Sequence, residues 1–145
     1  MNKLIYAFSL LYFLGLPFYY ALGHSKPQTA DIILALSGKK WEWIMHRQID
    51  SLDALFHEKL IFRQAAVKMD KPGYMGVIEN GSPYFRHVET LETDIQVLED
   101  LSILYTKVQF TTGDKQLSPE IKEVTEVYQN SPTGWKLITF QMSKD

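Results

Sequence analysis

A chain of 145 residues with 46% hydrophobic and 22% charged side chains is long enough for one globular core, and this composition excludes a disordered protein. The 15 basic and 17 acidic residues give a formal charge of -2 and are not gathered into a basic stripe, so nucleic acid is not an expected partner. The chain has no cysteine, which excludes disulfides, thiolate nucleophiles and thiolate metal sites.

The first 23 residues have the order of a secretory signal peptide. Lys3 precedes an apolar run from Leu4 to Leu16, and the small residues Ala21 and Gly23 follow it. This order of a basic, an apolar and a small-residue region predicts cleavage near Gly23. We therefore expect a secreted or periplasmic protein that has no contact with the membrane after cleavage.

An uncleaved anchor is the alternative for this segment. Phe18, Tyr19 and Tyr20 extend the apolar run toward the length that spans a bilayer. In that case the protein faces outward from a membrane. In either case, residues 24–28 are expected to be a flexible lead-in to a domain over 29–145.

The front of this domain is predicted to be helical. Apolar residues recur at intervals of three, four and seven over 30–49, which predicts a helix that Thr29 caps. Asp50 is expected to cap a second helix over 50–59. A third helix is predicted over 72–80, where proline suits the first turn.

The rest of the domain is predicted to be mostly strands. Alternation of apolar and polar residues, broken by turn residues, is typical of strands in an antiparallel sheet. The predicted strands are 60–64, 84–100, 101–112, 120–130 and 135–143, with turns at 113–115 and 131–134. Helices first and antiparallel strands last predict an α+β layer fold.

Two segments together resemble a known family. DSLDALFHEKLIF at 50–62 and TEVYQNSPTGWKL at 125–137 are similar to the SnoaL-like family. Its nuclear-transport-factor-two-like, or cystatin-like, fold is shared with ketosteroid isomerase and scytalone dehydratase. The resemblance implies three N-terminal helices packed on a strongly curved, mostly antiparallel sheet, with a largely apolar pocket between them. It also implies a homodimer that pairs through its sheets.

The family's usual site residues are changed in this chain. Gln64 stands where relatives often carry His after the first strand, and Glu123 stands where an Arg is common. Gln141 matches a position where many relatives carry His or Gln. A neutral Gln does not act as a base near pH 7, although it forms hydrogen bonds with a ligand.

Glu123 is the candidate general base. In a strand, Glu123 shares one face with Thr125 and Val127, while Glu126 lies on the other face with Val124 and Tyr128. If the Glu123 face lines the cone, its carboxylate is held in an apolar pocket, as proton transfer requires. The alternative is a solvated or ion-paired acid on the surface.

The remaining candidate residues are expected to bind a small apolar ligand. Aromatic and thioether walls suit such a ligand but also suit plain packing, and Arg47 is either an anchor for the polar edge or an exposed helix residue. The predicted ligand-binding residues are Trp43, Arg47, Phe62, Gln64, Tyr74, Tyr84 and Gln141.

No metal site or cofactor is predicted. The four His residues have no HxH, HxxxH or HExxH spacing, and glycine-rich phosphate loops are absent. His57 is interpreted as a cation at the C-terminal end of the second helix.

Three functions remain open at this stage. The first is a module that binds a small apolar molecule, and the second is an isomerase, dehydratase or cyclase with Glu123 as its base. The third is a dimerising module with a vestigial pocket. A buried Glu123 would favour the enzyme, and an exposed one would remove almost all support for it. A pocket closed by Trp43, Phe62 and Leu137 would favour the dimerising module.

Overall fold

We describe the fold in a computed structural model that covers residues 28–82, 84–112 and 119–143. The predicted signal peptide over 1–23, most of the lead-in and the turn predicted at 113–115 lie outside the described residues. None of the helices in this described part is long and apolar enough to cross a lipid bilayer.

In the part of the chain that the structure describes, three helices and six strands follow one another in the order predicted, with one added strand. They are α1 (Thr29–Met45), α2 (Ile49–Leu55), β1 (Phe56–Gln64), β2 (Val67–Asp70), α3 (Lys71–Glu79), β3 (Phe85–Val97), β4 (Leu101–Thr112), β5 (Glu120–Gln129) and β6 (Lys136–Met142). The strands form one sheet in the order β2-β1-β6-β5-β4-β3, in which only the β1–β6 pair is parallel.

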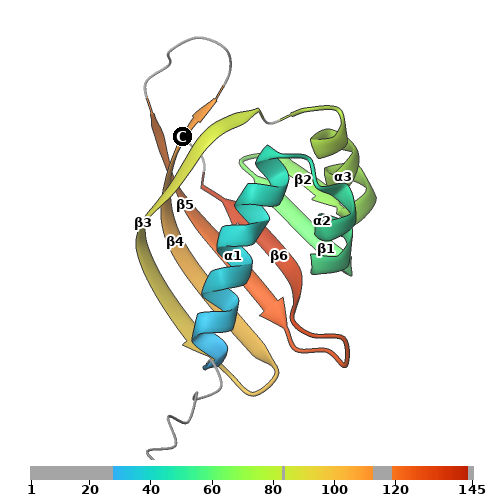
Figure 1. The fold of residues 1–145 in the computed structure, drawn as a ribbon, viewed down its shortest axis with the longest axis vertical. Coiled ribbons are helices and arrows are strands. Elements are labelled where there is room, and N and C mark those ends of the chain that lie inside the picture. Colours follow the sequence, from blue (N-terminus) through green and yellow to red (C-terminus); the bar gives the residue numbers. More distant parts are fainter. Residues whose placement is uncertain (1–27, 83, 113–118, 144–145) are drawn as a thin grey trace, which may run out of the picture.

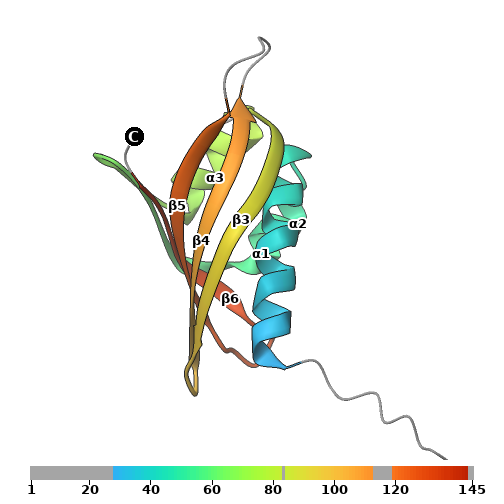
Figure 2. The same cartoon turned by 90° about the vertical axis from the view of Figure 1, so that its left-hand side faces the viewer.

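All three helices lie against one side of a curved sheet. Figure 1 shows α1 lying across the sheet, with α2 and α3 near β1 and β2. Against the sheet, α1 contacts β3 and β4, α3 contacts β1 and β2, and α2 contacts β1 and β6, while α2 also contacts α1 and α3. We call the side that meets the helices the inner face and the opposite side the outer face, which Figure 2 shows for β3, β4 and β5. This arrangement confirms the predicted α+β cone.

The second helix ends four residues before its predicted end. Phe56 already has extended backbone angles (φ -74°, ψ 128°) and pairs with Leu137 of β6. Pairing between distant segments therefore overrides the local helical pattern. The interpretation of His57 as a helix-end cation was wrong, because His57 lies in β1, where its Nδ1 accepts a hydrogen bond from the Lys59 N–H at 2.9 Å.

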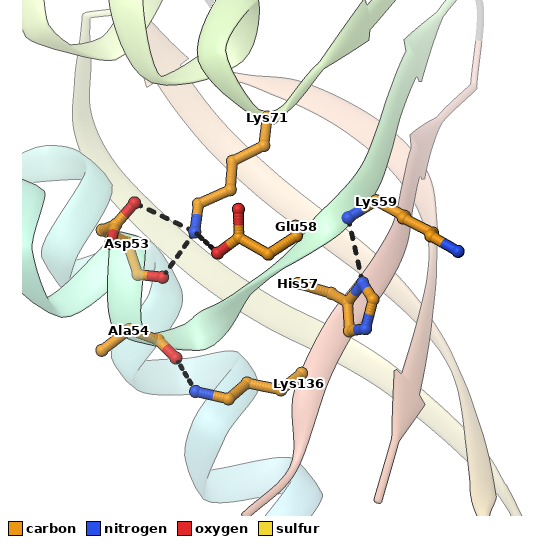
Figure 3. Close-up of polar contacts among 7 residues, drawn as sticks. All are labelled: Asp53, Ala54, His57, Glu58, Lys59, Lys71 and Lys136. Atoms are coloured by element: carbon orange, nitrogen blue, oxygen red, sulfur yellow. Dashed lines mark hydrogen bonds and ion pairs between the residues drawn. The ribbon is translucent and has the colours of Figure 1, made fainter. Parts of the chain in front are cut away.

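Two lysines from other elements, and not His57, provide the cations at the C-terminal end of α2 (Figure 3). Lys71 Nζ donates to the carbonyl oxygen of Asp53 at 3.0 Å, and Lys136 Nζ donates to that of Ala54. The last turn of α2 has no basic residue of its own, so these cations meet the negative end of its dipole. They fasten α2 to α3 and to β6.

Lys71 also forms ion pairs with two exposed carboxylates. Its Nζ lies 2.9 Å from Asp53 Oδ1 and 3.1 Å from Glu58 Oε1. Burial lowers the pKa of Lys71, but the hydrogen bonds and charges of Asp53 and Glu58 outweigh it, so the pKa is raised. Because both carboxylates are exposed, the ion pairs themselves add little to stability.

The strand β2 is an element that the sequence did not reveal. Residues 65–70 read as a loop, yet Val67–Asp70 pairs back on β1. Ala65 adopts a positive φ of 50° in the tight connection. Asp70 ends β2 and caps α3, since its Oδ1 accepts a hydrogen bond from the Gly73 N–H at 3.0 Å.

Candidate functional site

A charge pair is buried between α1 and the inner face of the sheet. Lys40 of α1 and Glu126 of β5 have side chains that are 0% exposed, and Lys40 Nζ lies 2.5 Å from Glu126 Oε1. Removing two charges from water has a large desolvation cost, so a pair in this position is unusual. It is the most prominent polar feature of the interior.

Two hydroxyls complete the surroundings of the carboxylate. Ser37 Oγ donates to Glu126 Oε1 at 2.9 Å, and the Tyr128 hydroxyl donates to Oε2. Ser37 and Lys40 are three residues apart on α1, and Glu126 and Tyr128 are two apart on β5, so each pair shares one face of its element. Glu126 therefore accepts hydrogen bonds from three donors of its own chain.

Aromatic rings enclose the ammonium group. Lys40 Nζ lies 4.0 Å from the centroid of the Trp41 ring and 3.9 Å from that of the Phe140 ring. The ring faces attract the cation and partly offset its lost hydration. The charge pair is thus held in a closed, mainly aromatic environment.

Further rings fill the space beside this cluster. Phe62 stacks on Tyr74 with centroids 4.1 Å apart and planes 7° apart, and Phe140 lies edge-on to both at 5.3 and 5.8 Å. Phe62, Tyr74 and Phe140 are at most 5% exposed. The chain's own side chains therefore occupy the place where a ligand pocket was expected.

The buried setting shifts three pKa values. Burial lowers the pKa of Lys40, and the nearby Glu126 carboxylate opposes this shift. Burial raises the pKa of Tyr128, and so do the charge and the hydrogen bond of Glu126. Burial and the charge of Glu126 also raise the pKa of Tyr74. Both tyrosines are neutral throughout the physiological range.

We expect the free energy of unfolding to fall steeply above about pH 10.5. In the folded protein Tyr74 and Tyr128 keep their protons, whereas in the unfolded chain they ionise near pH 10. Two protons held only in the folded state correspond to a loss of about 2.7 kcal/mol per pH unit, and below pH 10 this contribution is fully present. The lowered pKa of Lys40 makes the free energy of unfolding rise with pH instead. This contribution occurs only below about pH 10.4, where the lysine of the unfolded chain binds its proton.

Urea unfolding between pH 9 and 11.5 measures this loss. Replacing either Tyr74 or Tyr128 with Phe should halve the slope above pH 10.5, because one of the two protons is then absent. An unchanged free energy of unfolding up to pH 11.5 would contradict the assignment.

Two buried polar atoms have no hydrogen-bond partner among the described residues. They are Trp41 Nε1 and Thr106 Oγ1, in residues that are 3% and 6% exposed. Buried polar groups are nearly always paired, so each of these atoms requires an explanation. Trp41 is also the ring that packs on Lys40.

Glu123 lies outside this interior. It is exposed, because the inward residues of β5 are Lys122, Val124, Glu126 and Tyr128. Of the two alternatives for Glu123, the structure shows the exposed acid, because strand alternation places Glu123 on the outer face. The acid that the fold does bury is Glu126.

The predicted ligand-binding residues do not converge. Phe62 and Tyr74 lie together in the ring stack, whereas Tyr84 is 46% exposed. Gln64 ends β1 half-buried, and Gln141 is exposed on β6.

The first helix contributes two further predicted residues, which also lie apart. Trp43 is half-buried and, with Trp135, lines a separate apolar groove of 610 Å³ beside α2 and the β5–β6 turn. Arg47 follows α1 with a positive φ of 51° and is exposed; its guanidinium lies against Gly81. The structure therefore brings together only Phe62 and Tyr74 of the predicted set.

The polar members of the buried cluster were not among the residues predicted from the sequence. Ser37, Lys40 and Ile44 continue the helical stripe that begins at Ile33, so their spacing marked the inward side of α1. On β5, Glu126 stands between Val124 and Tyr128, and two apolar neighbours on one strand face indicate burial. Within the described residues, no group of three or more His, Asp and Glu side chains is placed to hold a metal ion.

Among the comparisons with known proteins, only the one with solved structures finds similar proteins. No family model matches the chain, and no curated protein matches its sequence. Solved structures of α+β cones do match it. An NTF2-like protein from Cytophaga hutchinsonii is 18% identical, with 81% of this chain and 98% of that chain covered and a TM-score of 0.74.

Two other similar structures have names that indicate different functions. A ketosteroid isomerase-like protein from Parabacteroides distasonis is 18% identical, with 80% and 87% of the two chains covered and a TM-score of 0.64. The association domain of CaMKII from C. elegans is 11% identical, with 79% and 94% covered and a TM-score of 0.66. The chain therefore has the NTF2-like fold, which confirms the fold that the resemblance implied.

Proposed function

We propose that this protein is a self-association module, in which the outer face of the sheet joins two copies and the inner face is a closed core. The observation that carries the proposal is a row of apolar and small side chains on the outer face, in the middle of the sheet. Neighbouring positions on four strands form this apolar row: Ile61, Thr139, Val127 and Ile103.

None of the helices that the structure describes lies above the apolar row. All helices of the described chain contact the inner face, and Figure 2 shows β3, β4 and β5 from their uncovered side. Tyr105 and Ile121, which also point outward, are 42% and 50% exposed. Several uncovered apolar side chains next to one another on a sheet face are typical of an interface between proteins.

The interior supports the same function rather than catalysis by Glu123. Phe62 and Leu137 are 5% and 0% exposed within a packed core, and Glu123 is on the other side of the sheet. Glu126 already accepts three hydrogen bonds. A similar structure is itself an association domain by name.

Sedimentation equilibrium of the purified protein tests this function. We expect a concentration-dependent equilibrium between monomer and dimer, and a monomer after Val127→Lys, because an ammonium group in the apolar row is desolvated on pairing. Leu34→Lys is the matched control, since Leu34 is 38% exposed on α1, away from the outer face. A protein that stays monomeric at every concentration would contradict the proposal.

A second candidate function is the binding of a small molecule at the buried cluster. The unpaired Trp41 Nε1 and Thr106 Oγ1 support it, because each is a buried polar atom that a ligand would satisfy. The ligand would be largely apolar, with an acceptor for the indole N–H. Native mass spectrometry of protein from its own source should then show a bound molecule; a bare mass in every preparation would count against it.

A further inference from the structure

Charged residues mark the two ends of one cross-strand row on the outer face. This charged row lies next to the apolar row and runs across all six strands. Its members, in order from β2 to β3, are Lys68, Arg63, Gln141, Thr125, Tyr105 and Asp94. Adjacent strands are about 4.8 Å apart, so the row is about 24 Å long.

The two ends of the row have opposite charge and a neutral middle. Lys68 and Arg63 form the basic end, and Asp94 forms the acidic end. No hydrogen bond or ion pair joins Arg63, Lys68 or Asp94 to another described side chain. The charges at both ends therefore remain available to a partner.

The acidic end of the row lies beside a hollow in the outer face. This hollow of 320 Å³ is lined by residues of β3, β4 and β5, which include Glu92, Asp94, Tyr105, Lys107, Glu123 and Thr125. Its lining has three carboxylates but one ammonium group, and Lys107 Nζ already pairs with Glu92 Oε1 at 3.1 Å. The lining of the hollow therefore has a net negative charge, which attracts a cationic side chain.

The direction of the row decides how two copies fit. When two outer faces pack about a two-fold axis parallel to the strands, the rotation reverses the row. The basic end of each copy then lies over the acidic end of the other, and the neutral Gln141 and Thr125 lie near the axis. A two-fold axis along the row would instead place basic ends over basic ends, which is repulsive.

We propose that two copies of this chain pair through their outer faces about a two-fold axis parallel to the strands, with Arg63 of each copy entering the acidic hollow beside Asp94 of the other. This inference rests on the proposed self-association and adds its orientation and its specificity. The apolar row supplies buried area, while the ends of the charged row set the register.

Charge reversal tests the pairing on the complete protein. Arg63→Glu and Asp94→Arg are each expected to raise the dimer dissociation constant at least about tenfold, because each change places like charges together at two symmetric contacts. The double variant, with both changes, should have a lower dissociation constant than either single variant, because positions 63 and 94 then carry opposite charges again, although Lys68 still faces the cation introduced at position 94. Lys39→Glu and Glu42→Arg, at exposed positions on α1, are the matched controls and should leave it unchanged.

Sedimentation equilibrium gives the dissociation constants, and circular dichroism with thermal melting verifies that each variant is folded. A dimer that neither single reversal weakens, or a double variant that pairs no more tightly than either single variant, would overturn this orientation and leave self-association intact. A protein that is monomeric at all concentrations would overturn the proposed function, and this pairing with it. Weakening of the dimer by added salt is expected as well, since the contacts are exposed until pairing.

Discussion

Replacing Glu126 by alanine is expected to lower the free energy of unfolding by about 3–5 kcal/mol. The change leaves the Lys40 ammonium group buried without its carboxylate, and it also removes the acceptor of Ser37 and Tyr128. Lys40 and Glu126 are both 0% exposed, so water does not compensate for the loss. Urea unfolding near pH 7 measures the difference.

A double variant distinguishes the contribution of the buried charges to stability from that of side-chain packing. Lys40→Met with Glu126→Gln removes both charges. Ser37 and Tyr128 donate to different oxygens of Glu126, so the Gln carbonyl accepts from one hydroxyl and the Gln amide donates to the other, which can rotate to accept. We expect this variant to be close to the unchanged protein or more stable by about 1–4 kcal/mol, since a buried ion pair is often no better than an apolar pair of similar volume. Glu123→Ala is the matched control for a glutamate on the same strand, and its effect should stay within about 0.5 kcal/mol.

The contrary result would change the interpretation of the cluster. If Glu126→Ala unfolds at nearly the same urea concentration as the unchanged protein, water or another group reaches Lys40 in solution. The cluster would then be open rather than closed, and small-molecule binding would become the stronger candidate.

Replacing Phe140 by alanine is expected to cost about 3–5 kcal/mol of stability. Phe140 is 0% exposed and lies edge-on to Trp41, Phe62 and Tyr74, with centroid distances of 5.5, 5.3 and 5.8 Å. It also covers the ammonium group of Lys40. Its loss leaves a cavity in the centre of the ring stack and weakens the surroundings of the buried cation.

The decrease in the free energy of unfolding should depend on the size of the cavity. Phe140→Leu keeps much of the volume and is expected to cost less than Phe140→Ala in the same urea experiment. Tyr84→Ala is the control for an aromatic residue that is 46% exposed, with an expected change within about 0.5 kcal/mol. Equal losses for Phe140→Ala and Tyr84→Ala would show that the ring stack is not the core of the cone.

The buried cluster and the outer face have different physical roles. The interior polar groups are satisfied mainly by each other, so they define how α1 sits on β5. The outer groups Arg63 and Asp94 have no partner within the described chain, so they are available to a second copy. Stability experiments report on the first set, and association experiments report on the second.

The sequence predicted the helices and most strands because their patterns are local. Side-chain periods of 3.6 and 2 follow from backbone geometry, and they placed the ends of β4 and β5 within one residue. The start of α1 was placed within one residue as well, but α1 ends at Met45, four residues before its predicted end. The same patterns gave wrong predictions where pairing between strands that are far apart in the sequence determines the secondary structure. The helix α2 ends at Leu55 because Phe56 pairs with Leu137, and β2 forms because β1 offers it an edge.

The inward face of β5 was left open by the sequence interpretation and is shown by the tertiary structure. The alternation along β5 separated Glu123 from Glu126, but a period of two is the same for either orientation of the strand. Val124 and Tyr128 beside Glu126 did indicate the buried side. Lys40 and Glu126 are 86 residues apart, and no local rule pairs two such charges.

By itself the sequence determined the class of fold, the order of most elements and the two faces of each strand, since these depend on local backbone geometry and on the burial of apolar side chains. The tertiary structure alone decided that Glu126 meets Lys40 inside, that the rings fill the cone, and that Arg63 and Asp94 lie at opposite ends of one row. These features depend on the register between strands and on the position of α1 against the sheet. Both are set only when segments that are far apart in the sequence pack together.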